Sequence, residues 1–131
     1  MAGLIVDGIH LPPEKVKTMV RAKTPERIIL VTDAVTCAGC APGRYRLGPL
    51  DVELSPEGRV WSPTSGTLAG SALLLPDGVA NLCRFAGMAI EEVLPLASTH
   101  PAAYLDETPR GMLELDWDPS AGTLRVEAVR I

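Results

Sequence analysis

The sequence predicts an α/β fold, and three observations lead to that class. Two short apolar runs, at residues 3–6 and 27–31, have the length and the continuous apolar character of strands buried in a parallel sheet. The segment between these runs repeats apolar residues at helical spacing. Later segments, at residues 44–61 and 112–129, alternate with a period of two, which is typical of strands in hairpins.

Composition limits the class of protein and its partners. The chain has 131 residues, 47% of them hydrophobic and 21% charged, with a formal net charge of −4, which predicts one globular domain. Its Lys and Arg residues are scattered, so we expect no nucleic-acid partner. No apolar run approaches about 18 residues, and the first residues lack a signal-peptide pattern. We therefore expect no membrane span and a cytoplasmic location.

The first part of the chain reads as a βαβ unit. Pro12 and Pro13 can open a helix, because proline is favoured in a first helical turn. Val16, Met19 and Val20 then recur on one face of that helix. Each strand of the unit is expected to be buried on both faces.

Hairpins and helices are predicted for the remainder. Residues 44–61 form a predicted hairpin around the turn-forming residues 55–58. A helix is expected from Pro76 to a C-terminal cap at Gly87, and a second helix from Ile90. The expected inward residues of these two helices are Val79, Leu82, Cys83 and Ala86, and Val93, Leu94 and Ala97.

The last third ends in β structure. Pro101 is expected to end the second helix near Thr99 and to begin a short helical turn that reaches Leu105. Residues 112–115 and 124–129 are predicted strands on either side of a loop rich in turn formers at 118–122.

Two polar residues stand where a parallel sheet places its chemistry. Asp33 follows the apolar run 28–31 closely, and His10 follows the first run. The carboxyl ends of parallel strands are where ligands and catalytic groups collect. Asp33 could equally cap the next turn, and a single His is often structural.

Three short motifs carry a resemblance to a known family. In their order and spacing they are similar to signatures of N-acetylglucosamine-6-phosphate deacetylases, over roughly residues 3–105. The motifs are Asp7-Gly8-Ile9-His10, Val31-Thr32-Asp33-Ala34 and Gly66-Thr67-Leu68-Ala69-Gly70-Ser71.

The resemblance implies the C-terminal part of a (β/α)8 TIM-barrel amidohydrolase, with β-hairpins of a small β-sandwich portion. A whole barrel takes about 250 residues, so residues 1–131 would be a single partial domain. Its expected parts are the last two barrel strands with their crossover helix (1–43), a hairpin (44–62), the substrate loop with helices (63–105) and a terminal hairpin (106–131).

The resemblance also implies the roles of site residues. Asp33 would be the general base and then the general acid, taking a proton from metal-bound water and delivering it to the leaving amine. The expected substrate-binding residues are Asp7, Gly8, Ile9 and His10, with Leu68, Ala69, Gly70 and Ser71. Their ligand would be an N-acetylated amino-sugar phosphate.

A divalent metal, zinc or iron, is implied for the complete enzyme. The family's ligands, a Glu and two His residues, come from strands that precede this segment, so no metal ligand is assigned to this chain. Its only histidines are His10 and His100, while a catalytic zinc site takes about three protein ligands. We expect the isolated chain to be inactive.

Cys37 and Cys40 form a C-x-x-C pair that could bind a metal or undergo redox chemistry, or be two loop thiols. The third interpretation is preferred, because no second ligand pair is present and the Pro42-Gly43 sequence that follows does not continue a helix. Cys83 is expected in the core, and all three thiols are expected to be reduced. His100 is expected to be structural, capping the turn before Pro101.

Three functional hypotheses follow. The chain is an enzyme portion completed by a missing N-terminal barrel segment, a non-catalytic sugar-phosphate binding module, or a structural fragment that self-associates. The first is preferred, because Asp33 and His10 are both present. A partial barrel exposes strand edges, so a homo-oligomer or a complex with the missing segment is expected.

Overall fold

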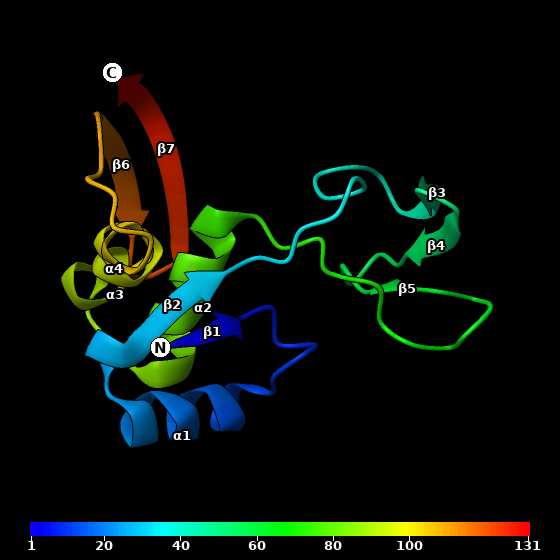
Figure 1. Ribbon diagram of the computed structural model, residues 1–131, viewed down its shortest axis with the longest axis horizontal. Helices are drawn as coiled ribbons and strands as arrows, with labels where there is room; N and C mark the ends of the chain where they lie inside the picture. Colours follow the sequence, from blue (N-terminus) through cyan, green and yellow to red (C-terminus); the bar gives the residue numbers. More distant parts are fainter. The chain divides into compact units, whose positions relative to one another are not determined.

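A computed structural model describes residues 1–131 (Figure 1). The chain divides into two compact units. Met1–Val31 and Leu75–Ile131 form the first unit, and Thr32–Leu74 form the second. None of the helices has the length and apolar character needed to cross a bilayer.

The first unit contains the predicted parallel pair of strands. β1 (Ala2–Ile5) lies beside β2 (Ile28–Val31) in parallel, with Ala2 opposite Ile28 and Ile5 opposite Val31. The predicted βαβ unit is therefore confirmed. The expectation that both strands are buried on both faces is wrong, because Gly3 is exposed and the side chain of Val31 is 36% exposed.

The crossover between these strands is helical. α1 (Pro13–Lys23) begins at the predicted proline pair and buries Val16 and Val20, and the 3-10 helix η1 (Pro25–Arg27) leads into β2. Met19 is only partly buried and packs against the edge of the core. Glu14 lies in the first turn of α1 and Arg21 and Lys23 lie in the last, which matches the charge preference of a helix dipole.

Three helices follow from residue 75. α2 (Leu75–Ala86) ends at Gly87, which has a φ of 70° and donates its N–H to the carbonyl of Cys83, as a C-terminal glycine cap does. α3 (Ile90–Ala97) buries Val93 and Leu96. Leu94 and Ala97, also predicted to face inward, are only partly buried but pack against the core.

The third of these helices, α4 (Thr99–Tyr104), starts two residues earlier than predicted. Proline is compatible with a first turn, where the missing N–H has no helical partner. Pro101 therefore lies inside α4 without breaking it.

The terminal hairpin is confirmed and is longer than predicted. β6 (Met112–Asp118) and β7 (Thr123–Arg130) pair in an antiparallel ladder. Glu114 faces Ala128 and Leu115 faces Val126, so Glu127 is the extra residue of a β-bulge.

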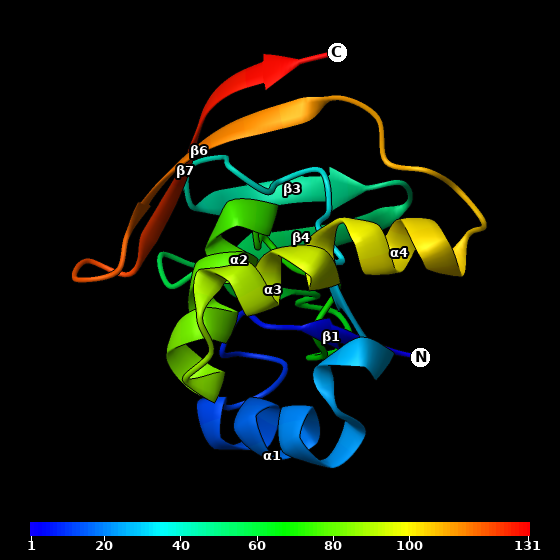
Figure 2. The ribbon, with the colours of Figure 1, turned by 90° about the vertical axis from the view of Figure 1, so that its left-hand side faces the viewer.

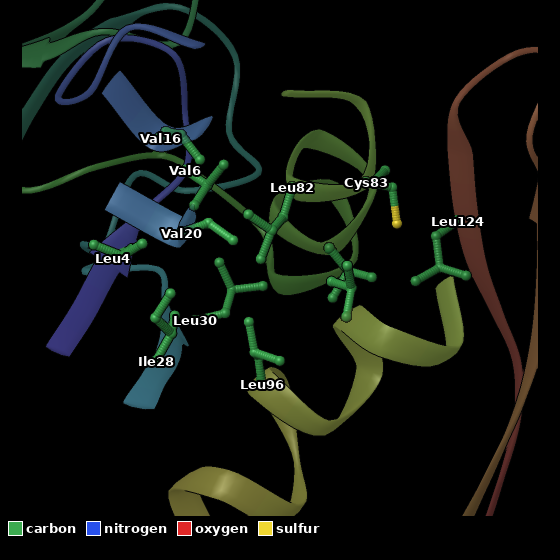
Figure 3. Packing of buried hydrophobic residues seen from close by; sticks show 13 residues of the cluster. Leu4, Val6, Val16, Val20, Ile28, Leu30, Leu82, Cys83, Leu96 and Leu124 are labelled. Carbon is green, nitrogen blue, oxygen red and sulfur yellow. The ribbon is translucent and has the colours of Figure 1, made fainter. Parts of the chain in front are cut away.

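A continuous hydrophobic core holds the first unit together. Leu82, Leu30 and Val20 point toward one another from α2, β2 and α1, and Cys83 of α2 faces Leu124 of β7 (Figure 3). Figure 2 shows α2 and α3 lying alongside the β6–β7 hairpin. Leu4 of β1 and Ile28 and Leu30 of β2 belong to this core.

The second unit is a small antiparallel sheet with its own core. β3 (Gly43–Leu47), β4 (Leu50–Leu54) and β5 (Val60–Trp61) lie in the order β3–β4–β5. The predicted hairpin at 44–61 is therefore extended by a third strand. The buried residues that this sheet shares with its loops are Cys37, Val52, Leu54 and Val60.

Candidate functional site

The turn after β1 is built around the carboxylate of Asp7. Oδ1 of Asp7 accepts hydrogen bonds from the backbone N–H groups of Ile9 and His10, each at 2.8 Å. Oδ2 lies 2.6 Å from Nδ1 of the His10 ring. Gly8 completes the turn with a φ of 75°, a conformation that glycine adopts without strain.

Helix α2 supports the base of this turn. The side chain of Asn81 donates from Nδ2 to the carbonyl oxygen of Val6 at 2.8 Å, and Val6 itself is fully buried. The ring of Phe85 lies at van der Waals distance from the position that a Cβ on Gly8 would take. Val6, the residue before the motif, is therefore anchored to helix α2, while His10 stays partly exposed.

Hydrogen bonds decide the ionisation of Asp7. Burial of the carboxyl opposes its ionisation, but the hydrogen bonds from the His10 ring and from the amides of His10 and Ile9 outweigh that effect and lower its pKa below the ordinary value. Asp7 is therefore ionised at neutral pH. It is one side of a carboxylate–imidazole pair.

Asp33 lies two residues beyond the end of β2, in the second unit, and has an unusual backbone. Its φ is 52°, in the left-handed region that residues other than glycine seldom adopt. Its side chain is exposed. Such a conformation persists only where the surroundings impose it, and residues of this kind gather at functional sites.

Ser71 imposes this conformation through three hydrogen bonds. Its N–H donates to the carbonyl of Asp33 at 2.8 Å, and its carbonyl accepts the N–H of Val35 at 3.0 Å. Its hydroxyl donates to the carbonyl of Thr32. Because Ser71 is buried, these bonds hold residues 32–35 from one side.

Gly70 makes the close approach of the two segments possible. Its φ is 77°, and a Cβ at this position would lie only 3.0 Å from the carbonyl oxygen of Asp33 and would collide with the side chain of Val35. Only glycine combines that backbone angle with that space. The N–H of Gly70 makes no hydrogen bond within the chain.

The remaining loop residues are held by the small sheet. Leu68 forms a bridge with Trp61, and the N–H of Ala69 donates to the carbonyl of Val60 at 3.1 Å. Both side chains are partly buried. The loop at 68–71 is therefore fixed by β5 at one end and by the Asp33 segment at the other.

The structure brings the candidate residues together in two groups. Asp7 and His10 are in contact in the first unit, and Asp33 is in contact with Ser71 in the second. Sequence patterns did not identify Asn81 as a supporting residue. A polar residue within the apolar stretch of a helix was the available signal.

The other candidates contribute no ligand cluster. Nowhere in the chain do three His, Cys, Asp or Glu side chains lie together as a metal site would require. Cys37 is buried, which raises the pKa of its thiol, while Cys40 is exposed, and both are free thiols. His100 is structural, as predicted, but it does not cap a turn: its Nδ1 lies 3.2 Å from the carbonyl oxygen of Ile28 in β2.

Known proteins resemble the chain over most of its length, although no family model matches it. An N-acetylglucosamine-6-phosphate deacetylase of Lysinibacillus sphaericus is 35% identical over 92% of the chain. A putative N-acetylgalactosamine-6-phosphate deacetylase of Escherichia coli K12 is 38% identical over 78% of the chain. The crystal structure of an N-acetylglucosamine-6-phosphate deacetylase from Thermotoga maritima matches with a TM-score of 0.78 at 34% identity, over 87% of the chain.

These similarities define the class as deacetylases of N-acetylated amino-sugar phosphates, which are amide-hydrolysing enzymes. Within this class, the chain is similar to one portion of N-acetylglucosamine-6-phosphate deacetylases. It spans 30% of the length of the Lysinibacillus relative, 59% of the Escherichia coli K12 relative and 33% of the Thermotoga structure. Such shares are consistent with a portion of the enzyme.

Proposed function

We propose that the chain is the C-terminal portion of an N-acetylglucosamine-6-phosphate deacetylase. The reaction is hydrolysis of the N-acetyl amide of the sugar phosphate, which gives glucosamine 6-phosphate and acetate. The observation that carries the proposal is the likeness of 92% of the chain to a deacetylase of which it spans 30%. The positions of His10 and Asp33 beyond two parallel strands support it.

In this proposal β1 and β2 are the last two strands of a (β/α)8 barrel. Their parallel pairing and the exposure of Val31 support that assignment, because the interior of a barrel is filled by side chains from other strands. β3–β5 and β6–β7 then belong to a small β-sandwich portion.

Asp33 is assigned the proton transfers. Its carboxylate accepts a proton from the attacking water as the oxygen–carbon bond forms, and it returns that proton to the nitrogen as the carbon–nitrogen bond breaks. A positioned carboxylate can contribute about 10² to 10⁴ in rate through such transfers. The exposure of its side chain and its imposed backbone support this role.

The sugar is assigned to the two loops. Asp7, Gly8, Ile9 and His10 form one substrate-binding segment, with His10 as the side chain that reaches the ligand. Leu68, Ala69, Gly70 and Ser71 form the other, in which the free N–H of Gly70 is available to an oxygen of the substrate.

The metal centre is assigned to a segment outside this chain. The side chains present do not suffice for zinc or iron, since no three potential ligands lie together and a catalytic zinc takes about three protein ligands. A Glu and two His residues would come from the missing barrel strands. The partner of the chain is then that segment, or other copies of the chain that cover its open edges.

A chimeric enzyme tests the function. The segment of the Lysinibacillus deacetylase that matches the chain is replaced by the chain, and release of acetate from N-acetylglucosamine 6-phosphate is measured with zinc or iron supplied. The proposal expects deacetylation by the chimera and none by the isolated chain. A folded chimera that binds metal but releases no acetate would contradict it.

A non-catalytic sugar-phosphate binding module is the second candidate. The absence of a three-ligand cluster favours it. It predicts that the isolated chain binds the sugar phosphate, as measured by calorimetry, while the chimera stays inactive. Binding by the isolated chain together with an active chimera would support the enzyme portion instead.

A further inference from the structure

We propose that Asp7 is a positioning residue: it holds His10 in the tautomer that carries its proton on Nδ1 and thereby presents Nε2 as a hydrogen-bond acceptor. The donor would be a hydroxyl or amide N–H of the N-acetylated amino sugar. That ligand rests on the proposed function, whereas the tautomer rests on the turn alone.

The first argument is the short contact between the two side chains. Oδ2 of Asp7 and Nδ1 of His10 are 2.6 Å apart, as short as a hydrogen bond to an ionised carboxylate becomes, since such bonds are shorter than those between neutral groups. An ionised carboxylate has no proton to donate, so the proton between these atoms belongs to the imidazole. In the neutral ring the other nitrogen, Nε2, then carries a lone pair.

The second argument is that both oxygens of Asp7 are already engaged. Oδ1 accepts two backbone N–H groups, from Ile9 and from His10 itself. The side chain of Asp7 is 8% exposed, whereas that of His10 is 21% exposed. The carboxylate is therefore placed to orient the ring, and the ring is placed to meet a ligand.

The third argument is that the pair is rigid. Three bonds fix Asp7 within its own turn, and Asn81 ties the preceding Val6 to helix α2. Nε2 of His10 has no hydrogen-bond partner in the chain. An anchored imidazole with one occupied and one free nitrogen is suited to binding at a fixed geometry.

Nitrogen NMR of the isolated chain tests the tautomer directly. The chain contains only two histidines, so long-range ¹H–¹⁵N correlation spectra of the labelled protein are simple to interpret. His10→Gln removes one set of ring signals and assigns it. At about pH 8, where an ordinary imidazole is neutral, we expect His10 to show a protonated Nδ1 and an unprotonated Nε2.

Asp7→Asn provides the mutational arm. The amide oxygen of an Asn must stay on the two backbone N–H groups, so its NH₂ group turns to Nδ1 of His10, and the ring proton should move to Nε2. Asp116→Asn, in the exposed β6 strand, is the matched control and should change neither ring. The His100 signals report whether each variant keeps its fold.

Two outcomes overturn the proposal. One is a wild-type His10 with its proton on Nε2. The other is a folded Asp7→Asn variant that keeps the proton on Nδ1. If Asp7→Asn does not fold, the wild-type spectrum decides alone. An inactive chimera would count against the proposed function without affecting this result, so the two failures can be told apart.

Discussion

The left-handed backbone of Asp33, just beyond the end of β2, is held by contacts with Gly70 and Ser71. A left-handed residue other than glycine costs about 1–2 kcal/mol. Ser71 offsets this cost with three hydrogen bonds to residues 32–35, and Gly70 lets the two segments meet. The orientation of Asp33 therefore depends on a loop that lies far from it in sequence.

Gly70→Ala should destabilise the second unit more than an equivalent change without a close neighbour. It adds a methyl group against Val35 and the carbonyl of Asp33 at a positive φ, and we expect a loss of about 2–4 kcal/mol. Gly66→Ala is the matched control, because Gly66 has a φ of 70° and nothing near its Cβ position. Chemical denaturation measures both, and equal losses would show that the close approach has no effect.

Protonation of Asp7 should weaken the turn after β1. The folded-state pKa of this carboxyl lies below its ordinary value of 3.8, so the unfolded chain binds the proton more readily. The stabilisation is present above pH 3.8 and is lost as the pH falls through the lower, folded value. The free energy of unfolding measured from pH 5 downward should fall less steeply in Asp7→Asn than in the wild type, and parallel curves would contradict this.

At the scale of elements, the sequence predicted those helices and strands whose positions are determined by interactions between residues close together in the chain. The apolar runs, the proline pair before α1 and Gly87 after α2 act within a few residues, and those elements lie where the sequence predicted them. Burial was predicted less well. Leu96 rather than Leu94 is buried, because packing of α3 against β2 and α2 decides which face is covered.

The candidate site shows the same division. The Asp7–His10 pair could be anticipated from adjacency in sequence, and the resemblance singled out Asp33. The contact of Ser71 with Asp33 could not be predicted from local patterns, because the two residues are 38 positions apart in the chain. It depends on a bridge between Ala34 and Ser71. In the small sheet, the predicted turn at 55–58 joins β4 to β5, whereas the turn between Leu47 and Leu50 that separates β3 from β4 was not predicted.

The α2 helix should carry much of the stability of the first unit. Leu82 is fully buried among β2, α1 and α3 side chains. Leu82→Ala should lower the free energy of unfolding by about 2–5 kcal/mol, because it leaves a cavity. Leu74→Ala is the control: it removes the same atoms from an exposed position and should change the free energy of unfolding little. Similar losses in the two variants would argue against this core.

At the scale of the whole molecule, the exposed apolar surface is the main feature. Val31, Leu113 and Val129 are 36%, 55% and 64% exposed, and the β1–β2 sheet has only two strands. Surfaces of this kind tend to acquire partners. The chain spans 30% of its Lysinibacillus relative, which agrees with a portion that lacks its neighbours.

The isolated chain should therefore self-associate. We expect sedimentation at micromolar concentration to show a homo-oligomer, or a complex when the missing barrel segment is supplied. Val129→Glu should weaken self-association, while Glu127→Gln, also on β7, should not. A stable monomer with cooperative unfolding would contradict the expectation and would favour an independent module.

The central claim, that Asp33 is the proton-transferring residue of a deacetylase portion, is tested most directly by the rate of acetate release from the chimera with Asp33→Asn. We predict a loss of about 10² to 10⁴ in kcat, with metal content and KM little changed. Asp51→Asn, an exposed change in β4, should leave kcat unaltered. An Asp33→Asn chimera that retains its full kcat would contradict the claim.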